Sequence, residues 1–248
     1  MHKYTHDSVV PFKDSKLSKK EQVADMFDRI ALRYDFLNRL LSGGIDVRWR
    51  KKAIKELAEI NPQIILDVAT GTADVAVMMT KYLKPQKVIG IDISEGMLEL
   101  GKEKIKELHL NRLVELYTGD GEAIDFPDAA FDAITVAFGV RNFASLEKGL
   151  TEMLRVLKPG GKLVVLEFSK PRQGVFKKMY ALYMKAAAAG IGKWVAKSRE
   201  AYEYLNASVN AFPEGSDFLE ILSKAGYEAP YMKTLTFGIC SIYGATKK

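Results

Sequence analysis

A short apolar run at residues 64–68 ends in a glycine-containing turn, Ala69-Thr70-Gly71-Thr72, and helical spacing resumes at Asp74. A continuous apolar run of this length is typical of a strand buried on both faces of a parallel sheet. Four more strands are expected further along the chain, with helical stretches between most of them, at 87–92, 114–118, 131–137 and 162–168. This alternation predicts a doubly wound, Rossmann-like α/β sheet.

The two ends of the chain add elements to this core. Apolar residues at intervals of three and four predict an N-terminal helix over 19–41, and a second helix is expected over 47–57. Near the C-terminus, a predicted helix over 217–225 precedes two strands, 231–235 and 239–246, with little sequence between them. These two strands predict an antiparallel hairpin that completes a seven-stranded sheet.

The domain organisation follows from the absence of an internal repeat or a long linker in the sequence. One domain is therefore expected over 1–248. Its expected parts are an N-terminal helical cap (1–60), a cofactor-binding core (61–169), a helical lid inserted between strands five and six (170–215), and a C-terminal helix with the hairpin (216–248).

Composition is that of an ordinary globular protein and argues against several classes of function. The 37 Lys and Arg and 31 Asp and Glu give a net charge of +6, and 48% of residues are hydrophobic. A single cysteine, Cys240, fits a reducing compartment, and the N-terminus lacks a secretory leader, so a cytoplasmic protein is expected. The three histidines are too few and too scattered for a zinc site, so no metal is expected.

Most of the positive charge lies in one segment. Residues 170–200 hold eight Lys and Arg against one Glu, a net charge of +7, whereas residues 21–169 have a net charge of −3. A general nucleic-acid binder spreads its charge more widely, so no nucleic acid is expected as a partner. Aromatic side chains accompany these basic ones, which is typical of helices on anionic membrane surfaces. We therefore expect peripheral membrane contact through 170–200; the alternative is a solvated helical cover of the core.

Glycine and carboxylate residues follow successive strands, at the ends where open α/β sheets bind their ligands. Gly71 allows close approach of the backbone to a ligand, and Thr72 to Asp74 present amides at a helix N-terminus. Asp92, which follows 21 residues after Gly71, can accept both hydroxyls of a ribose. These residues could also serve only as loop caps, but their common position at the strand ends favours a nucleoside site.

The choice of nucleoside depends on the charges around the turn. A dinucleotide motif requires glycine at three positions, whereas positions 69, 71 and 74 are Ala, Gly and Asp. Asp67 and Asp74 would repel a pyrophosphate, but they tolerate a sulfonium. Asp120 and Gly121 follow the third strand, where they can meet an adenine edge. S-adenosyl-L-methionine is therefore the expected cofactor.

Specific motifs extend from about residue 20 to the C-terminus. Tyr34-Asp35-Phe36-Leu37-Asn38 and Phe138-Gly139-Val140-Arg141-Asn142 are distinctive, whereas the turn Lys158-Pro159-Gly160-Gly161 is common to many methyltransferases. With these motifs the chain resembles the C-methyltransferases of ubiquinone and menaquinone biosynthesis. The resemblance implies the class I adenosylmethionine-dependent methyltransferase fold. One departure is Ala73, where many members have glycine.

The resemblance also implies a reaction, namely methylation of a ring carbon of a polyprenylated, demethylated quinol. It assigns Arg141 to stabilising a phenolate or orienting a water, and Asn142 and Tyr34 to hydrogen-bonding the quinol oxygens. Tyr34 also fits the core face of its helix, and Arg141-Asn142 also fits a helix-capping turn.

The acceptor itself is less firmly defined by the sequence. The Gly-Thr-Ala-Asp form of the turn at 71–74 favours demethylmenaquinol, the precursor of menaquinol. The benzoquinol of ubiquinone biosynthesis and other small aromatic or lipid acceptors remain open. So do a catalytically silent binding protein, the prenyl length and assembly into a homo-oligomer.

Overall fold

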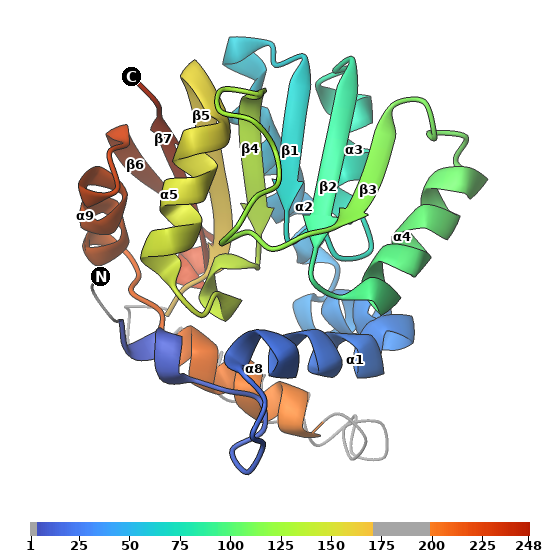
Figure 1. The fold of residues 1–248 in the computed structure, drawn as a ribbon, viewed down its shortest axis with the longest axis vertical. Helices are drawn as coiled ribbons and strands as arrows, with labels where there is room; N and C mark the ends of the chain where they lie inside the picture. Colours follow the sequence, from blue (N-terminus) through green and yellow to red (C-terminus); the bar gives the residue numbers. More distant parts are fainter. Residues whose placement is uncertain (1–3, 171–198) are drawn as a thin grey trace.

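A computed structural model describes residues 4–170 and 199–248 of the chain. Within these ranges, seven strands form one sheet in the order β3-β2-β1-β4-β5-β7-β6 (Figure 1). The strands are β1 Ile64–Val68, β2 Lys87–Asp92, β3 Val114–Thr118, β4 Phe131–Ala137, β5 Leu157–Phe168, β6 Glu228–Leu235 and β7 Cys240–Thr246. Strands β1 to β5 are parallel, and β7 is antiparallel to both β5 and β6. The predicted doubly wound sheet with a C-terminal antiparallel hairpin is confirmed.

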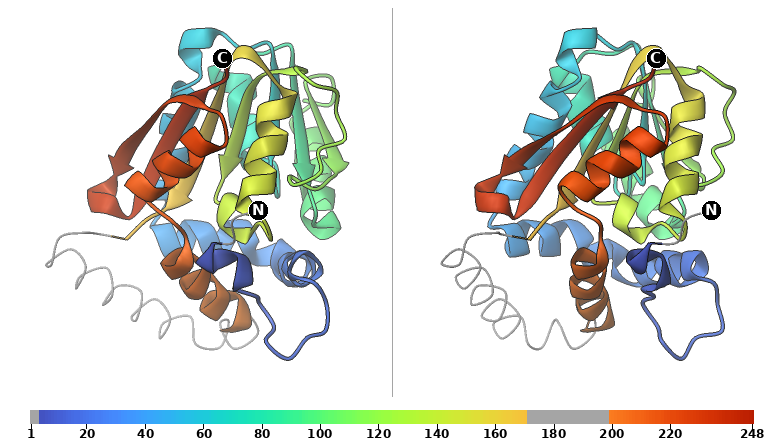
Figure 2. Two further views of the ribbon diagram at one scale, coloured as in Figure 1. Left: turned by 60° about the vertical axis from the view of Figure 1, so that its left-hand side comes forward. Right: turned by 90° about the vertical axis from the view of Figure 1, so that its left-hand side faces the viewer.

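Helices cover both faces of this sheet (Figures 1 and 2). One face carries α2 to α4, and the other carries α5 and α9. The described helices are α1 Lys19–Ser42, α2 Ile45–Lys55, α3 Asp74–Tyr82, α4 Glu95–Glu107, α5 Leu146–Val156, α8 Arg199–Ala211 and α9 Ser216–Lys224. Short 3-10 turns are η1 Thr5–Ser8, η2 Ala58–Ile60, η3 Val140–Asn142 and η4 Thr236–Gly238.

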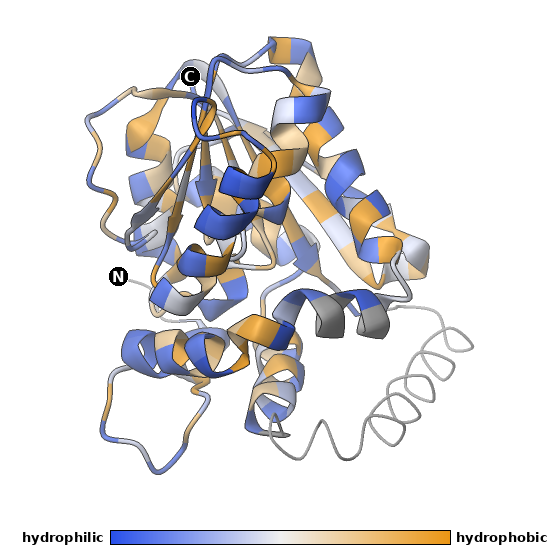
Figure 3. Cartoon of the chain, turned by 90° about the vertical axis from the view of Figure 1, so that its right-hand side faces the viewer, coloured by the Kyte–Doolittle hydropathy of each residue, from blue (hydrophilic) through white to orange (hydrophobic). Residues whose placement is uncertain are grey.

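The apolar run in β1 is buried on both sides, which explains why it shows no alternation with polar residues. Leu66 and Val68 contribute to the core beneath α5 and α9, whereas Ile65 contributes to the core beneath α2 and α3. All three side chains are almost fully excluded from solvent. Each helix instead carries an apolar face and a polar face, and α4 presents much of its polar face outward (Figure 3).

Strand β5 begins five residues earlier than the sequence predicts. Leu157 pairs with Phe131 at the start of β4, and the register then shifts before Lys162 pairs with Ala133. The turn that contains Gly160, which has a φ of +74°, therefore lies inside the strand as an irregularity. A local sequence pattern marks such a turn but does not show that pairing resumes on both sides of it.

The N-terminal helix α1 lies across the carboxyl end of the sheet together with α8 (Figure 1). Polar contacts join α1 to the core along its length. Asp28 Oδ1 accepts hydrogen bonds from Ser94 Oγ at 2.6 Å and from Gly96 N at 2.9 Å. Further along, Asp35 accepts from Thr72 Oγ1 at 2.7 Å. Since Ser94 and Gly96 begin α4, Asp28 satisfies a free amide at that helix N-terminus.

The lid expected over 170–215 is described only in part. Residues 171–198 lie outside the described residues, so the lid and the membrane contact expected of 170–200 stay predictions. The described part, α8, contacts η1 and η3. In the described ranges, no helix combines the length and the apolar character that crossing a membrane requires.

The contact between Asp28 and α4 gives a first prediction. Asp28→Ala removes an acceptor at a helix N-terminus and should lower the free energy of unfolding by about 1 kcal/mol. It should also speed hydrogen exchange in α1. Asp25→Ala is the matched control, because within the described ranges Asp25 forms a solvent-accessible ion pair with Arg29, one turn along α1, and makes no hydrogen bond or ion pair with α4. If the amides of α1 exchange at the same rate in the two variants, Asp28 does not hold α1 against α4.

Candidate functional site

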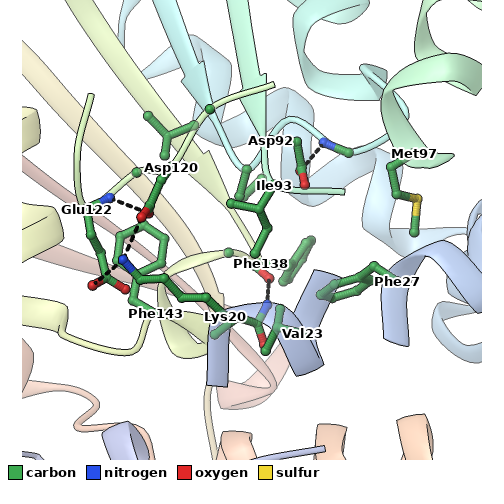
Figure 4. Close-up of a pocket in the computed structure, with 18 of the residues that line it drawn as sticks. Lys20, Val23, Phe27, Asp92, Ile93, Met97, Asp120, Glu122, Phe138 and Phe143 are labelled. Atoms are coloured by element: carbon green, nitrogen blue, oxygen red, sulfur yellow. Dashed lines mark hydrogen bonds and ion pairs between the residues drawn. The ribbon is translucent and has the colours of Figure 1, made fainter. Parts of the chain in front are cut away.

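A pocket of about 660 Å³, open to solvent, lies between α1 and the carboxyl ends of the parallel strands. The pocket brings together most of the site residues predicted from the sequence, namely Tyr34, Gly71, Asp92, Asp120, Gly121 and Asn142. Residues of α1 form one wall, and the loops after β1 to β4 form the other (Figure 4).

The loop after β1 is held by the carboxylate at the end of β2. Gly71 N donates to Asp92 Oδ2 at 2.8 Å, and Ser94 N donates to Asp92 Oδ1 at 2.9 Å. Gly71 has a φ of +56°, and a Cβ built there would meet no atom within 4 Å. The positive φ therefore favours glycine, and open space lies where a side chain would project.

Asp92 is buried, and its local environment is mostly backbone. Burial raises the pKa of the Asp92 carboxyl, whereas backbone donors at Ser94, Gly71 and Ile93 lower it. An ionised carboxylate has about four acceptor positions on its two oxygens. Asp92 can therefore hold the loop and still accept hydrogen bonds from a ligand in the pocket.

A charged cluster spans the pocket between α1 and the loop after β3. Lys20 Nζ lies 2.5 Å from Asp120 Oδ2 and 3.0 Å from Glu122 Oε2 (Figure 4). Burial alone would lower the pKa of Lys20, but hydrogen bonds to the two carboxylates raise it. Glu122 is buried and also accepts from Ala144 N at 2.6 Å.

Sequence reasoning missed both Lys20 and Glu122. Lys20 lies 100 residues from Asp120 in the chain and belongs to a polar leader with many lysines, so nothing local marks it. Glu122 follows the predicted pair Asp120-Gly121 directly, and its place one residue beyond a site motif was the only available signal.

The rest of the pocket is largely apolar. Phe27, Ile93, Met97 and Phe143 contribute to its walls (Figure 4). Tyr34 packs edge-to-face on Phe27, with ring centroids 5.8 Å apart and the planes at 82°. Apolar walls with a few fixed polar groups are typical of a site for an aromatic or nucleoside ligand.

Three residues predicted to bind the cofactor direct their polar groups elsewhere. Asp67 is buried under the loop, where Thr135 Oγ1 donates to Oδ1 at 2.6 Å and Thr70 Oγ1 donates to Oδ2 at 2.7 Å. Thr72 donates to α1, as described above. Asp74 pairs with Lys104 Nζ at 2.7 Å, and the same carboxylate contacts two arginines. None of the three is among the described lining residues, so in this structure they organise the loop and helix α3.

The loop after β4 places Arg141 and Asn142 differently. Asn142 lines the pocket, whereas Arg141 is 5% exposed and its Nη1 contacts Glu167 Oε1 at 3.0 Å and the carbonyl of Phe138. Burial raises the pKa of Glu167, and the Arg141 charge lowers it. The guanidinium predicted to act at the acceptor is thus anchored to a buried carboxylate at the end of β5.

Comparison with known proteins identifies the family. The sequence model of the ubiE/COQ5 methyltransferase family matches residues 15–247, which is nearly the whole chain. This chain belongs to the ubiE/COQ5 methyltransferase family. The resemblance inferred from the motifs is therefore confirmed.

The chain also matches bacterial relatives over most of their length. The chain is 46% identical over 244 residues to a demethylmenaquinone methyltransferase of Bacteroides fragilis, covering 98% of this chain and 99% of the relative. It is 44% identical over 230 residues to a ubiquinone/menaquinone biosynthesis C-methyltransferase UbiE of Geobacter sulfurreducens, covering 92% and 90% of the two chains.

Solved structures support the fold of this family member at lower sequence identity. A SAM-dependent methyltransferase from Aquifex aeolicus matches with a TM-score of 0.57 and 23% identity, over 80% of this chain and 89% of that one. The [4+2]-cyclase SpnF matches with a TM-score of 0.64 and 17% identity, over 92% and 96%. The second match shows that the fold alone does not specify a reaction.

The departure at Ala73 has a structural explanation. Ala73 precedes α3 with a φ of +63°, in the left-handed region that glycine adopts without penalty. Its methyl group is fully buried. Ala73 therefore holds a left-handed backbone that costs a residue other than glycine about 1 kcal/mol.

The buried Asp67 gives a prediction about pH. Burial raises the pKa of Asp67 from 3.8 to about 6. Hydrogen bonds from Thr135 and Thr70 lower this pKa, but the effect of burial is larger. Between these values the folded state binds more protons than the unfolded state, so the contribution of Asp67 to stability falls as pH rises. Relative to Asp67→Asn, the wild type should lose about 2–3 kcal/mol of unfolding free energy from pH 4 to pH 7, measured by urea denaturation. A constant difference across this range would contradict the prediction.

Proposed function

We propose that this chain is an S-adenosyl-L-methionine-dependent C-methyltransferase that converts a demethylmenaquinol to menaquinol. The observation that carries this proposal is the 46% identity, over 98% of the chain, to a relative named demethylmenaquinone methyltransferase. The corresponding benzoquinol step is the alternative, supported by the relative named ubiquinone/menaquinone biosynthesis C-methyltransferase.

The residues of the pocket fit adenosylmethionine in charge and in shape. The described lining includes three carboxylates, Asp92, Asp120 and Glu122, and one cation, Lys20, so negative groups outnumber positive ones. Such a pocket suits a cationic sulfonium and disfavours a pyrophosphate. The open space at Gly71 and the free acceptor positions of Asp92 suit a nucleoside with ribose hydroxyls.

Adenosylmethionine supplies an electrophilic methyl group: a ring carbon of the quinol gains it, the carbon–sulfur bond breaks with its electron pair on sulfur, and the ring proton is released. The protein residues position the acceptor for this displacement. We assign hydrogen bonds to the quinol oxygens to Asn142 and Tyr34, which line the pocket. Arg141, fixed by Glu167, supplies positive charge near the developing phenolate.

The substrate assay tests the function directly. Purified protein is incubated with labelled adenosylmethionine and, separately, with a reduced demethylmenaquinol and the reduced benzoquinol precursor of ubiquinone. We expect methyl transfer to the demethylmenaquinol at the higher kcat/KM. Higher kcat/KM with the benzoquinol would instead support the alternative, and transfer to neither quinol would overturn both.

Asp92 should determine affinity for the cofactor. Asp92→Ala removes an acceptor that also orders the Gly71 loop, so the Kd for adenosylmethionine should rise about 10- to 100-fold in calorimetry. Asp125→Ala is the control, because Asp125 is an exposed carboxylate beyond the site. Unchanged affinity in Asp92→Ala would remove Asp92 from the cofactor site.

The proposal extends to the location of the reaction. A polyprenylated quinol resides in a bilayer, so we propose that the protein is cytoplasmic and contacts the inner membrane surface through the basic segment 170–200. Its composition, with a net charge of +7, supports this contact. The fraction of protein that sediments with anionic liposomes should therefore fall as salt is added. Binding that does not depend on salt would contradict the electrostatic contact.

A further inference from the structure

Among the buried polar atoms without hydrogen-bond partners in the described residues, three belong to η3 and to helix α8, which contacts it. In the described part of the chain, Arg141 Nε, Asn142 Oδ1 and Tyr204 Oη are all buried and have no hydrogen-bond partner. Arg141 and Tyr204 are 5% and 3% exposed. Buried polar groups are nearly always paired in folded proteins, so such a group requires an explanation.

These atoms come from elements that pack together. Arg141 and Asn142 belong to η3, and α8, which carries Tyr204, contacts η3. Burial raises the pKa of the Tyr204 hydroxyl, and the charges of Arg141 and Glu167 act on it in opposite directions. The hydroxyl therefore lies in the electrostatic field of the Arg141–Glu167 ion pair.

The same group of atoms adjoins the pocket. Asn142 lines the pocket, and its unpartnered Oδ1 belongs to the group. The Tyr204 ring packs in a small cluster with Val23 and Met26 of α1, and Val23 also lines the pocket. Packing alone would be satisfied by phenylalanine at position 204, because the hydroxyl has no hydrogen-bond partner among the described residues.

We propose that Tyr204 is part of the acceptor site, where its hydroxyl, Asn142 Oδ1 and Arg141 Nε bind an oxygen of the quinol. This inference rests on the proposed function. A phenolic O–H can donate to Asn142 Oδ1, and the phenolic oxygen can accept from Tyr204 and Arg141. As negative charge grows on that oxygen during methylation, both donors face it.

The test compares two buried tyrosines. Tyr204→Phe removes a hydroxyl without a partner, so its melting temperature should equal or exceed that of the wild type. Its Kd for adenosylmethionine should be unchanged, and kcat/KM for demethylmenaquinol should fall at least fivefold. Tyr227→Phe is the matched control, because Tyr227 Oη donates to the carbonyl of Leu150 at 3.1 Å. That control should melt at a lower temperature and keep the wild-type kcat/KM.

The outcomes separate this inference from the function on which it rests. If the wild type methylates the quinol and Tyr204→Phe loses less than fivefold in kcat/KM, Tyr204 is not in the acceptor site. If Tyr204→Phe unfolds or melts well below the wild type, its hydroxyl is partnered in the free protein and the inference fails. If the wild type does not methylate any quinol, the proposed function fails first, and this inference fails with it.

Discussion

The hydrogen bond between Gly71 N and the Asp92 carboxylate is the interaction on which the pocket depends. It forms because β1 and β2 are parallel and in register, with Asp67 opposite Gly90, so that both strands deliver their loops to the same edge. The loop after β1 then has a fixed shape, and the start of α3 follows from it. Asp67, beneath the loop, supports the same shape through two threonine hydroxyls.

Helix α1 completes the pocket by polar attachment more than by burial. Its contacts to the core include the Asp28 and Asp35 hydrogen bonds and the Lys20 ion pairs. Such exposed polar contacts contribute little to the free energy of unfolding, because water can replace either partner. The sheet beneath is held by two large apolar cores. Apolar burial therefore holds the sheet beneath the pocket, whereas the wall formed by α1 combines a small apolar cluster with hydrogen bonds and ion pairs to the core.

The sequence carried enough information for the sheet and for one half of the site. Apolar runs mark the strand ends, so the sequence alone predicts that Gly71, Asp92 and Asp120 lie at one edge of the sheet. Lys20 and Tyr204 could not, because each reaches the site from a distant helix whose local pattern shows only amphipathicity. The pairing of Arg141 with Glu167 could not be predicted either, because the two residues are 26 positions apart and their contact depends on the pairing of β4 with β5.

The two halves of the site differ in how their polar groups are satisfied. On the cofactor side, Asp92, Asp120 and Glu122 already accept hydrogen bonds in the protein alone. On the side of η3 and α8, buried donors and acceptors remain without partners. Unsatisfied buried groups reduce stability, and folded proteins retain them chiefly where function requires them. The unpaired groups thus lie where a ligand with its own hydroxyl groups can supply the missing hydrogen bonds. An oxidised quinone could still accept from Tyr204 and Arg141, but it has no hydroxyl to donate to Asn142 Oδ1, so Asn142 is the group that would favour a reduced quinol over a quinone.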